Sequence, residues 1–240
     1  LIILKSISGI KRYLKPKNLH VFFLSMVIKN FNSKRFTYLF LSKHIENNFN
    51  KSKRLINTIP HKTIDLPYYF DLIKSKSPSK DFCYGTIGKG DLGMTKSLLE
   101  KRKNLKFKIV RSIASKEFIQ YKNCIFFDQN TRLSREKIRK EVEEVDFLLF
   151  FYPENHYQLS VSGALYDAIN YLKPIIFLRN SCISYYNDTY NIGIECESLE
   201  EMISIIDSKV ELEKNHSIFS KNMEKLKLKL NNDDISLLWD

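Results

Sequence analysis

The sequence of 240 residues contains only four cysteines, and no two of them form a C-x-x-C pair. They are widely spaced, and three of the four lie inside or beside apolar runs, where a thiol behaves as a small hydrophobic side chain. This pattern excludes a disulfide framework and a cysteine-based zinc site, and it is typical of a reduced, cytoplasmic protein. The four are Cys83, Cys124, Cys182 and Cys196.

The sequence also lacks an apolar run long enough to cross a bilayer. The apolar stretch at residues 19–28 is far shorter than the roughly 20 residues that a membrane-spanning helix needs. Residues 1–15 lack the cleavage pattern of a signal peptide. The chain begins with Leu1 rather than Met, so one expectation is a fragment whose true start lies upstream. We expect a cytoplasmic protein, with a peripheral position at the inner membrane as a further candidate.

No recognition helix, zinc-finger spacing or aromatic RNA-binding signature is present, so the sequence gives no support for a nucleic-acid partner. The net charge of +12 nevertheless requires an explanation. One interpretation is a solvated, Lys-rich surface of the kind common in proteins from AT-rich genomes. The other is attraction to phosphate-bearing substrates or to an anionic membrane surface. Both interpretations stay open.

From residue 81 onward, short apolar runs alternate with amphipathic stretches at the spacing of βαβ units. The run DFLLFFY at residues 146–152 has five consecutive apolar residues, which is typical of a central parallel strand covered on both faces. The pattern predicts an α/β fold with a doubly wound, parallel, Rossmann-like sheet. Strands are expected at residues 82–87, 107–113, 124–127, 146–152, 174–178 and 192–196, and helices at 94–102, 134–145, 162–172, 199–206 and 210–230.

Residues 1–80 have a less regular pattern, with expected strands at 19–26 and 36–41, a helix at 42–49 and a strand end at 59–66. Pro67, Pro78 and the Lys/Ser residues between them have the composition of a linker. Three parts are therefore expected. They are a partial N-terminal domain with its linker at 1–78, a Rossmann-like domain at 79–208 and a C-terminal helical extension at 209–240.

Glycine is scarce, yet four of the seven glycines fall within residues 85–93, at the end of the first expected strand of the sheet and directly after it. Gly85, Gly88 and Gly90 allow the backbone to approach a phosphate, and Lys89 adds a positive charge beside the next helix N-terminus. The spacing matches neither the Walker pattern nor the dinucleotide-binding G-x-G-x-x-G. The segment is therefore either an anion cradle or a tight β-to-α turn without a ligand.

A second candidate site opens the helix expected after residues 146–152. Ser160, Ser162 and Gly163 occupy the anion-binding end of this helix, and their hydroxyl and N–H groups suit a diphosphate. Asp167 lies one turn beyond Gly163 on the same face and could accept hydrogen bonds from ribose hydroxyls. The alternative is that Ser162 is a plain N-cap and Asp167 a solvated acid favoured by the helix dipole.

The loop at residues 153–156 is a third candidate, either a set of solvated polar residues or a contact to a sugar through Glu154. No Asp-x-Asp motif is present, so neither a metal nor a cofactor is expected.

Taken together, these residues resemble the donor-binding domain of GT-B glycosyltransferases, especially the family 4-like group. Residues 162–176 follow the order of that family's phosphate turn, acidic residue, helix and Pro-hydrophobic strand, and the resemblance extends over residues 36–207. It places Asp167 at the acid that binds the nucleotide ribose. The family's pair of glutamates eight residues apart is not intact, because Leu159 stands at the other position and only Glu154 is near enough to replace it.

The resemblance implies transfer of a sugar from a nucleotide diphosphate-sugar, such as a UDP-sugar, to a hydroxyl of a glycan or lipid-linked acceptor. The product would belong to a bacterial surface polysaccharide, such as capsule or lipopolysaccharide, or to a glycolipid. Lys89 and the N–H groups near Gly88, Ser162 and Gly163 would neutralise the leaving diphosphate. The acceptor domain is mostly absent, so no catalytic residue is assigned. Two alternatives stay open: a degenerate nucleotide-sugar-binding partner and a GT-B-shaped sugar-nucleotide epimerase.

Overall fold

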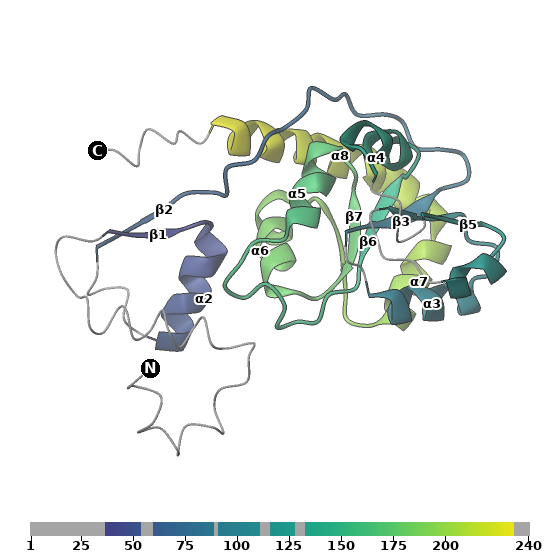
Figure 1. Ribbon diagram of the computed structural model, residues 1–240, viewed down its shortest axis with the longest axis horizontal. Coiled ribbons are helices and arrows are strands. Elements are labelled where there is room, and N and C mark those ends of the chain that lie inside the picture. The colour runs from purple at the N-terminus through teal and green to yellow at the C-terminus, as the bar shows by residue number, and fades with distance from the viewer. Residues whose placement is uncertain (1–36, 54–59, 89–90, 111–115, 128–132, 233–240) are drawn as a thin grey trace, which may run out of the picture.

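The computed structural model describes residues 37–53, 60–88, 91–110, 116–127 and 133–232 (Figure 1). The strand expected at 19–26 lies outside these ranges. The described chain consists of a large α/β unit, a small βαβ unit and the segment that joins them. The expected domain boundaries stay a prediction.

The large unit is built on a parallel sheet of six strands in the order β5-β4-β3-β6-β7-β8. The sheet grows from β3 to one side through β4 and β5 and then to the other side from β6, so the direction of winding reverses between β3 and β6. This confirms the doubly wound parallel sheet. The strands are β3 (Tyr84–Ile87), β4 (Phe107–Val110), β5 (Cys124–Phe126), β6 (Phe147–Phe150), β7 (Ile175–Leu178) and β8 (Gly193–Cys196).

Helices cover both faces of the sheet and give it two hydrophobic cores. Along β6, Leu148 and Phe150 belong to one core, whereas Phe147 and Leu149 belong to the other. Because both faces are buried, this strand is apolar throughout. The helices are α3 (Leu92–Lys101), the 3-10 helix η4 (Lys116–Gln120), α4 (Arg135–Glu143), α5 (Gly163–Asn170), α6 (Ser181–Tyr190), α7 (Leu199–Asp207) and α8 (Lys209–Asn232).

Three serines cap helices, as the sequence predicts. The hydroxyls of Ser134, Ser162 and Ser198 each accept a hydrogen bond from the backbone N–H three residues further on, at 3.2 Å. Helix α6 was not predicted; it begins after the N-cap Asn180 and is followed by the C-cap Asn191 in the left-handed conformation, φ 51°. A buried carboxamide and a left-handed asparagine therefore define this helix.

The C-terminal helix α8 is part of the packed unit. Leu212, Phe219, Met223 and Leu226 are buried in the same two cores as the sheet. The expected helical extension is therefore in direct contact with the Rossmann-like sheet's helices, including α5 and α7.

The small unit consists of β1 (Tyr38–Phe40), α2 (Lys43–Lys53) and β2 (His61–Thr63), with β1 and β2 paired in parallel. Phe40, Ile45 and Phe49 form its core. Leu159 and Val161, from the loop before α5, pack against that core. The small unit therefore rests on the loop that leads into the candidate donor helix.

Residues 64–80, which we call the strap, join the two units. Figure 1 shows the strap running from β2 past α8 and α4 to β3. The Asp71 N–H donates to the Asn170 side chain at 2.7 Å, and the Asn170 amide donates back to the Asp71 carboxylate at 3.0 Å. Lys227 of α8 donates to the Asp71 carbonyl at 2.5 Å. The expected linker is thus fastened to α5 and α8.

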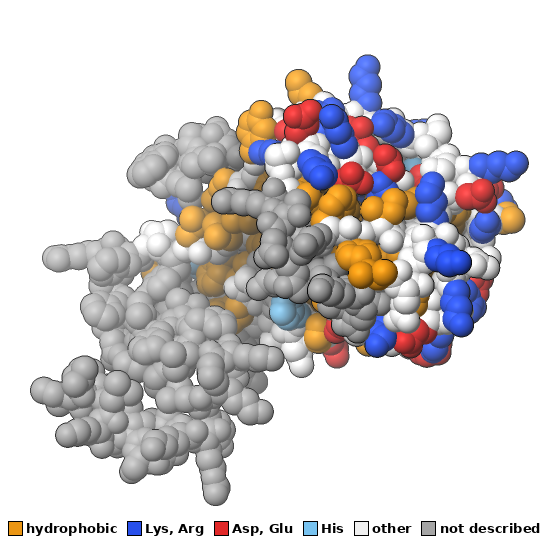
Figure 2. All heavy atoms as spheres, turned by 45° about the vertical axis from the view of Figure 1, so that its right-hand side comes forward, with side chains coloured by type: hydrophobic (Ala, Val, Ile, Leu, Met, Phe, Trp, Pro, Cys, Tyr) orange, Lys and Arg blue, Asp and Glu red, His pale blue; other side chains and the backbone are white. Residues whose placement is uncertain are grey.

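The surface in view in Figure 2 has Lys and Arg side chains interspersed with Asp and Glu. All four cysteines are buried and unpaired. Among the described residues, no helix combines the length and the apolar character needed to span a membrane.

Candidate functional site

The loops after β3 and β6 meet where the winding of the sheet reverses, which is where open parallel sheets bind ligands. Gly88 directly follows β3 with φ +78°, a conformation that favours glycine. A Cβ at this position would lie 3.5 Å from the Cβ of Ala164 in the first turn of α5. The structure therefore brings Gly88 and the N-terminus of α5 side by side.

The other members of the glycine segment differ from expectation. Gly85 is not part of the turn, because it is the second residue of β3. A Cβ there would lie 2.8 Å from the Lys108 carbonyl and 3.0 Å from the Val145 side chain, so close packing within the sheet explains the glycine. The prediction that Gly85 contributes to a ligand turn is therefore wrong. Lys89 and Gly90 lie outside the described residues, and their roles stay predictions.

The N-terminus of α3 is already capped by a carboxylate. Asp91 accepts a hydrogen bond from the Met94 N–H at 2.9 Å. The partial positive charge of a helix N-terminus stabilises a nearby anion, and here the Asp91 carboxylate is that anion. An anion at the end of β3 would therefore meet Asp91, which the sequence analysis did not consider.

The N-terminus of α5 has the opposite character, because its first turn contains no acidic residue. Gly163 is exposed, and a Cβ built on it meets no atom within 4 Å. Ser162 is fully buried and its hydroxyl caps the helix, which is the plain N-cap alternative. Ser160 is exposed at the entry to the helix. The backbone near Gly163 is therefore open, and its anion-binding role stays a prediction.

Asp167 lies one turn further along α5 and is only 8% exposed. Its carboxylate accepts a hydrogen bond from the Tyr68 hydroxyl of the strap. Burial, together with this bond, raises the pKa of Tyr68, so the phenol stays protonated and remains a donor. The alternative of a solvated acid is wrong, because Asp167 is buried and in contact with Tyr68 of the strap. Its predicted role at the ribose stays a prediction, and Tyr68 would compete for the same carboxylate.

A buried asparagine, Asn180, anchors the loop between β6 and α5 through hydrogen bonds to its backbone. The Asn180 side-chain amide donates to the carbonyls of Pro153 and His156, each at 2.9 Å, while its oxygen caps α6. The His156 ring stacks on Tyr152, with ring centroids 5.5 Å apart. Glu154 is exposed on this loop. The loop therefore has a defined backbone with polar side chains facing solvent.

The small unit holds the other half of the same loop. His44 of α2 is buried, and its Nε2 lies 3.1 Å from the carbonyls of Tyr157 and of Ser160. Burial lowers the pKa of His44 below its usual value, which favours the neutral ring. Because both neighbours of Nε2 are carbonyls, Nε2 carries the proton, and Nδ1 accepts from the Ser42 hydroxyl at 2.8 Å.

His44 also ends a chain of polar groups. The Tyr186 hydroxyl lies 3.2 Å from Ser42 Oγ and 3.1 Å from the Asp65 carboxylate. Sequence reasoning missed this chain of contacts, because its residues carry no local motif and the partners of His44 Nε2 and of the Tyr186 hydroxyl are more than 100 residues away. Among the described residues, no group of three or more His, Cys, Asp or Glu side chains could hold a metal ion.

No protein-family model matches the chain, and no curated protein matches it. Solved structures do. Anabaena HepE in complex with UDP has a TM-score of 0.61 at 13% identity, over 95% of this chain and 69% of its own. The pneumococcal O-GlcNAc transferase GtfA, in complex with UDP and GlcNAc, has a TM-score of 0.60 at 11% identity, over 85% of this chain and 44% of its own.

TarM is similar with a TM-score of 0.55 at 11% identity, over 84% of this chain and 41% of its own. The chain thus spans less than half the length of TarM and of GtfA. At these identities, the similarity concerns the fold, in which helices cover a parallel Rossmann-like sheet beside a second, smaller unit. On this evidence the chain has the GT-B glycosyltransferase fold, over part of that fold's full length.

Proposed function

We propose that this chain binds the donor of a glycosyltransferase, which moves a sugar from a nucleotide diphosphate-sugar to a hydroxyl group. The observation that carries the proposal is the open N-terminus of α5 beside Gly88, at the reversal point of the sheet. Two proteins of the same fold, HepE and GtfA, have been crystallised with UDP, which makes UDP the first donor nucleotide to test.

In the proposed mechanism, the diphosphate lies on the backbone N–H groups of the first turn of α5. These groups are fixed by the Ser162 cap, so they need no rearrangement as charge develops on the leaving diphosphate. Lys89 adds a positive charge from the loop after β3. Glu154 faces the sugar from the loop that Asn180 and His44 hold in place.

The acceptor is proposed to be a glycan or a lipid-linked hydroxyl, at the cytoplasmic face of an anionic membrane. Another protein of this fold, WaaG, is a glycosyltransferase involved in lipopolysaccharide biosynthesis, which supports surface polysaccharide as the product class. The proposed reaction uses the nucleotide-sugar as substrate and needs no separate cofactor or metal.

A non-catalytic, nucleotide-sugar-binding partner is the second candidate. It is favoured by Leu159, which replaces the family's other glutamate, and by the Tyr68 hydroxyl that engages Asp167. Hydrolysis or transfer of UDP-sugar, measured with the acceptor-side domain supplied, distinguishes the two. Binding without turnover favours the partner, and an epimerised nucleotide-sugar would indicate the epimerase.

The donor site is tested with Gly163→Asp and its matched control Gly163→Asn. Both side chains fit the open space, and both are good residues at a helix N-terminus, but only Asp repels a diphosphate. We expect calorimetry to give a UDP Kd at least tenfold weaker for Gly163→Asp and close to that of the original chain for Gly163→Asn. Equal binding by the two variants would remove α5 from the donor site.

A further inference from the structure

A cavity of about 140 Å³ lies at the amino-terminal ends of the strands, whereas the candidate donor site lies at their carboxyl-terminal ends. It is lined on one side by the strap and on the other by residues that precede β6 and β7, including Asp146 and Lys173. One water molecule needs roughly 10–15 Å³ of such space, so the cavity has room for a small polyatomic group.

Lys173 places an amine on the wall of this cavity. The side chain is only 8% exposed, and its Nζ donates to the Glu143 backbone carbonyl at 3.0 Å. An ammonium group has three donors, and no described carboxylate lies within ion-pair distance of this one. Burial lowers the pKa of Lys173 to about 8, so the group is still mostly charged at pH 7.

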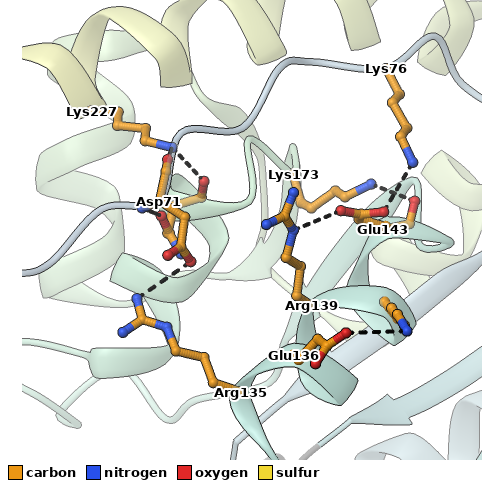
Figure 3. Close-up of polar contacts among 10 residues, drawn as sticks. Asp71, Lys76, Arg135, Glu136, Arg139, Glu143, Lys173 and Lys227 are labelled. Carbon is orange, nitrogen blue, oxygen red and sulfur yellow. Dashed lines mark hydrogen bonds and ion pairs between the residues drawn. The ribbon is translucent and has the colours of Figure 1, made fainter.

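The two carboxylates at the cavity already have partners of their own. Figure 3 shows Glu143 bound by Arg139 at 3.0 Å and by Lys76 at 3.1 Å. Asp146 accepts from the N–H groups of Ser79 at 3.0 Å and Cys83 at 2.8 Å. The negative charges of Glu143 and Asp146 are therefore already stabilised by these donors.

The rim of the cavity adds further cations and a hydroxyl. Lys74, Lys76 and Ser77 come from the exposed part of the strap. His216 contributes a buried ring whose pKa is lowered by burial, which favours the neutral imidazole, so this ring adds hydrogen-bonding groups rather than charge. A metal cation entering here would meet the Lys173 ammonium. An anion would gain its unused donors.

We propose that this cavity binds a phosphate group, with Lys173 at its base and Lys74 and Lys76 at its rim. The phosphate is either free or part of a lipid headgroup. The second source is considered because Leu72, next to the lining residue Ile73 on the same strap, exposes a large apolar side chain. This site is independent of the donor site, so failure of either proposal leaves the other standing.

The test titrates the chain with inorganic phosphate, against chloride at the same ionic strength, and follows ³¹P line broadening and heat of binding. The variant Lys173→Met keeps the length of the side chain and removes the ammonium. Lys122→Met, at an exposed lysine away from the cavity, is the control. We expect saturable binding that weakens at least tenfold in Lys173→Met and is unchanged in Lys122→Met.

A second arm identifies the source of the phosphate. Vesicles of phosphatidylcholine, with and without phosphatidic acid, are sedimented with the chain and with Lys173→Met. Retention on phosphatidic acid that depends on Lys173 assigns a headgroup, and its absence assigns a free phosphate. Circular dichroism checks that Lys173→Met is folded, and Lys74→Ser, at the exposed rim, repeats the test if it is not. Equal binding by the original chain and the variants in both arms, or binding in neither, overturns the proposal.

Discussion

The hydrogen bond between Tyr68 and Asp167 joins the strap to α5, and its removal tests whether the strap is part of the folded unit. Tyr68→Phe deletes one hydroxyl and keeps the ring, which packs 5.5 Å from Tyr166 and 5.1 Å from Phe70 between centroids. The Asp167 carboxylate would lose a donor while staying almost fully buried.

The size of the effect follows from the chemistry of the contact. A hydrogen bond to a charged group contributes about 1.5–3 kcal/mol to the free energy of unfolding. Removing the donor loses a contribution of this size, because the buried carboxylate is left without a partner to replace it. For a unit of this size, 1 kcal/mol corresponds to about 2–4 °C in Tm. We therefore expect Tyr68→Phe to lower Tm by about 3 to 12 °C.

Tyr69→Phe is the matched control, because the neighbouring ring is exposed and lies under the Arg135 guanidinium, 4.9 Å from its centroid. A change at that surface position should stay within about 0.5 kcal/mol. Urea unfolding followed by circular dichroism measures both variants, and Asp167→Asn completes a double-mutant cycle. If Tyr68→Phe and Tyr69→Phe unfold alike, the strap is not fastened through Asp167.

The same variant bears on the donor site. If Asp167 binds a ribose hydroxyl, the nucleotide competes with Tyr68 for the carboxylate. Tyr68→Phe should then lower the Kd for UDP, whereas Asp167→Asn should raise it. A higher Kd in Tyr68→Phe would mean that the phenol itself contacts the nucleotide.

Three further predictions concern packing, loop anchoring and pH. Gly193→Ala should cost about 3 kcal/mol in urea unfolding, because its Cβ would lie 2.1 Å from the Ile175 carbonyl, whereas Gly163→Ala meets no neighbour and should be nearly neutral. Asn180→Asp keeps the α6 cap but cannot donate to the two loop carbonyls; it should weaken UDP binding, and unchanged binding would show that the anchored loop is not needed. Burial lowers the pKa of Lys173 from 10.5 to about 8, so between these pH values the unfolded chain binds more protons than the folded one. The free energy of unfolding should therefore rise with pH in this range, by on the order of 3 kcal/mol relative to Lys173→Met in phosphate-free buffer. If the free energy of unfolding of the original chain and of Lys173→Met changed with pH in the same way, this prediction would be contradicted.

Features with a local signal could be predicted from the sequence. The apolar run at residues 146–152 predicted β6, because a strand buried on both faces needs no alternation. Ser134, Ser162 and Ser198 predicted the starts of three helices, because capping involves only the next three residues. The doubly wound parallel sheet could likewise be predicted, because short apolar runs alternate with amphipathic stretches at the spacing of βαβ units.

Features that depend on distant partners could not be predicted. The helix α6 is rich in aromatic, β-branched and hydroxyl residues with low helix propensity, and it is held by packing and by Asn180. The contact between Asp167 and Tyr68 could not be predicted, because the two residues are 99 positions apart in the sequence. Gly85 was assigned to a turn, because the Lys108 carbonyl that requires a glycine comes from the neighbouring strand.

The contact of His44 with the loop before α5 has a consequence for protein engineering. The loop before α5 is positioned by residues on both sides of the strap, since two of its carbonyls contact the His44 ring of the small unit. A chimera that exchanges donor specificity by joining two homologues near residue 78 would pair this loop with a foreign α2. Specificity should transfer more faithfully when residues 37–80 travel with the Rossmann-like unit, and substitutions at position 44 should be inherited together with changes at 157–160.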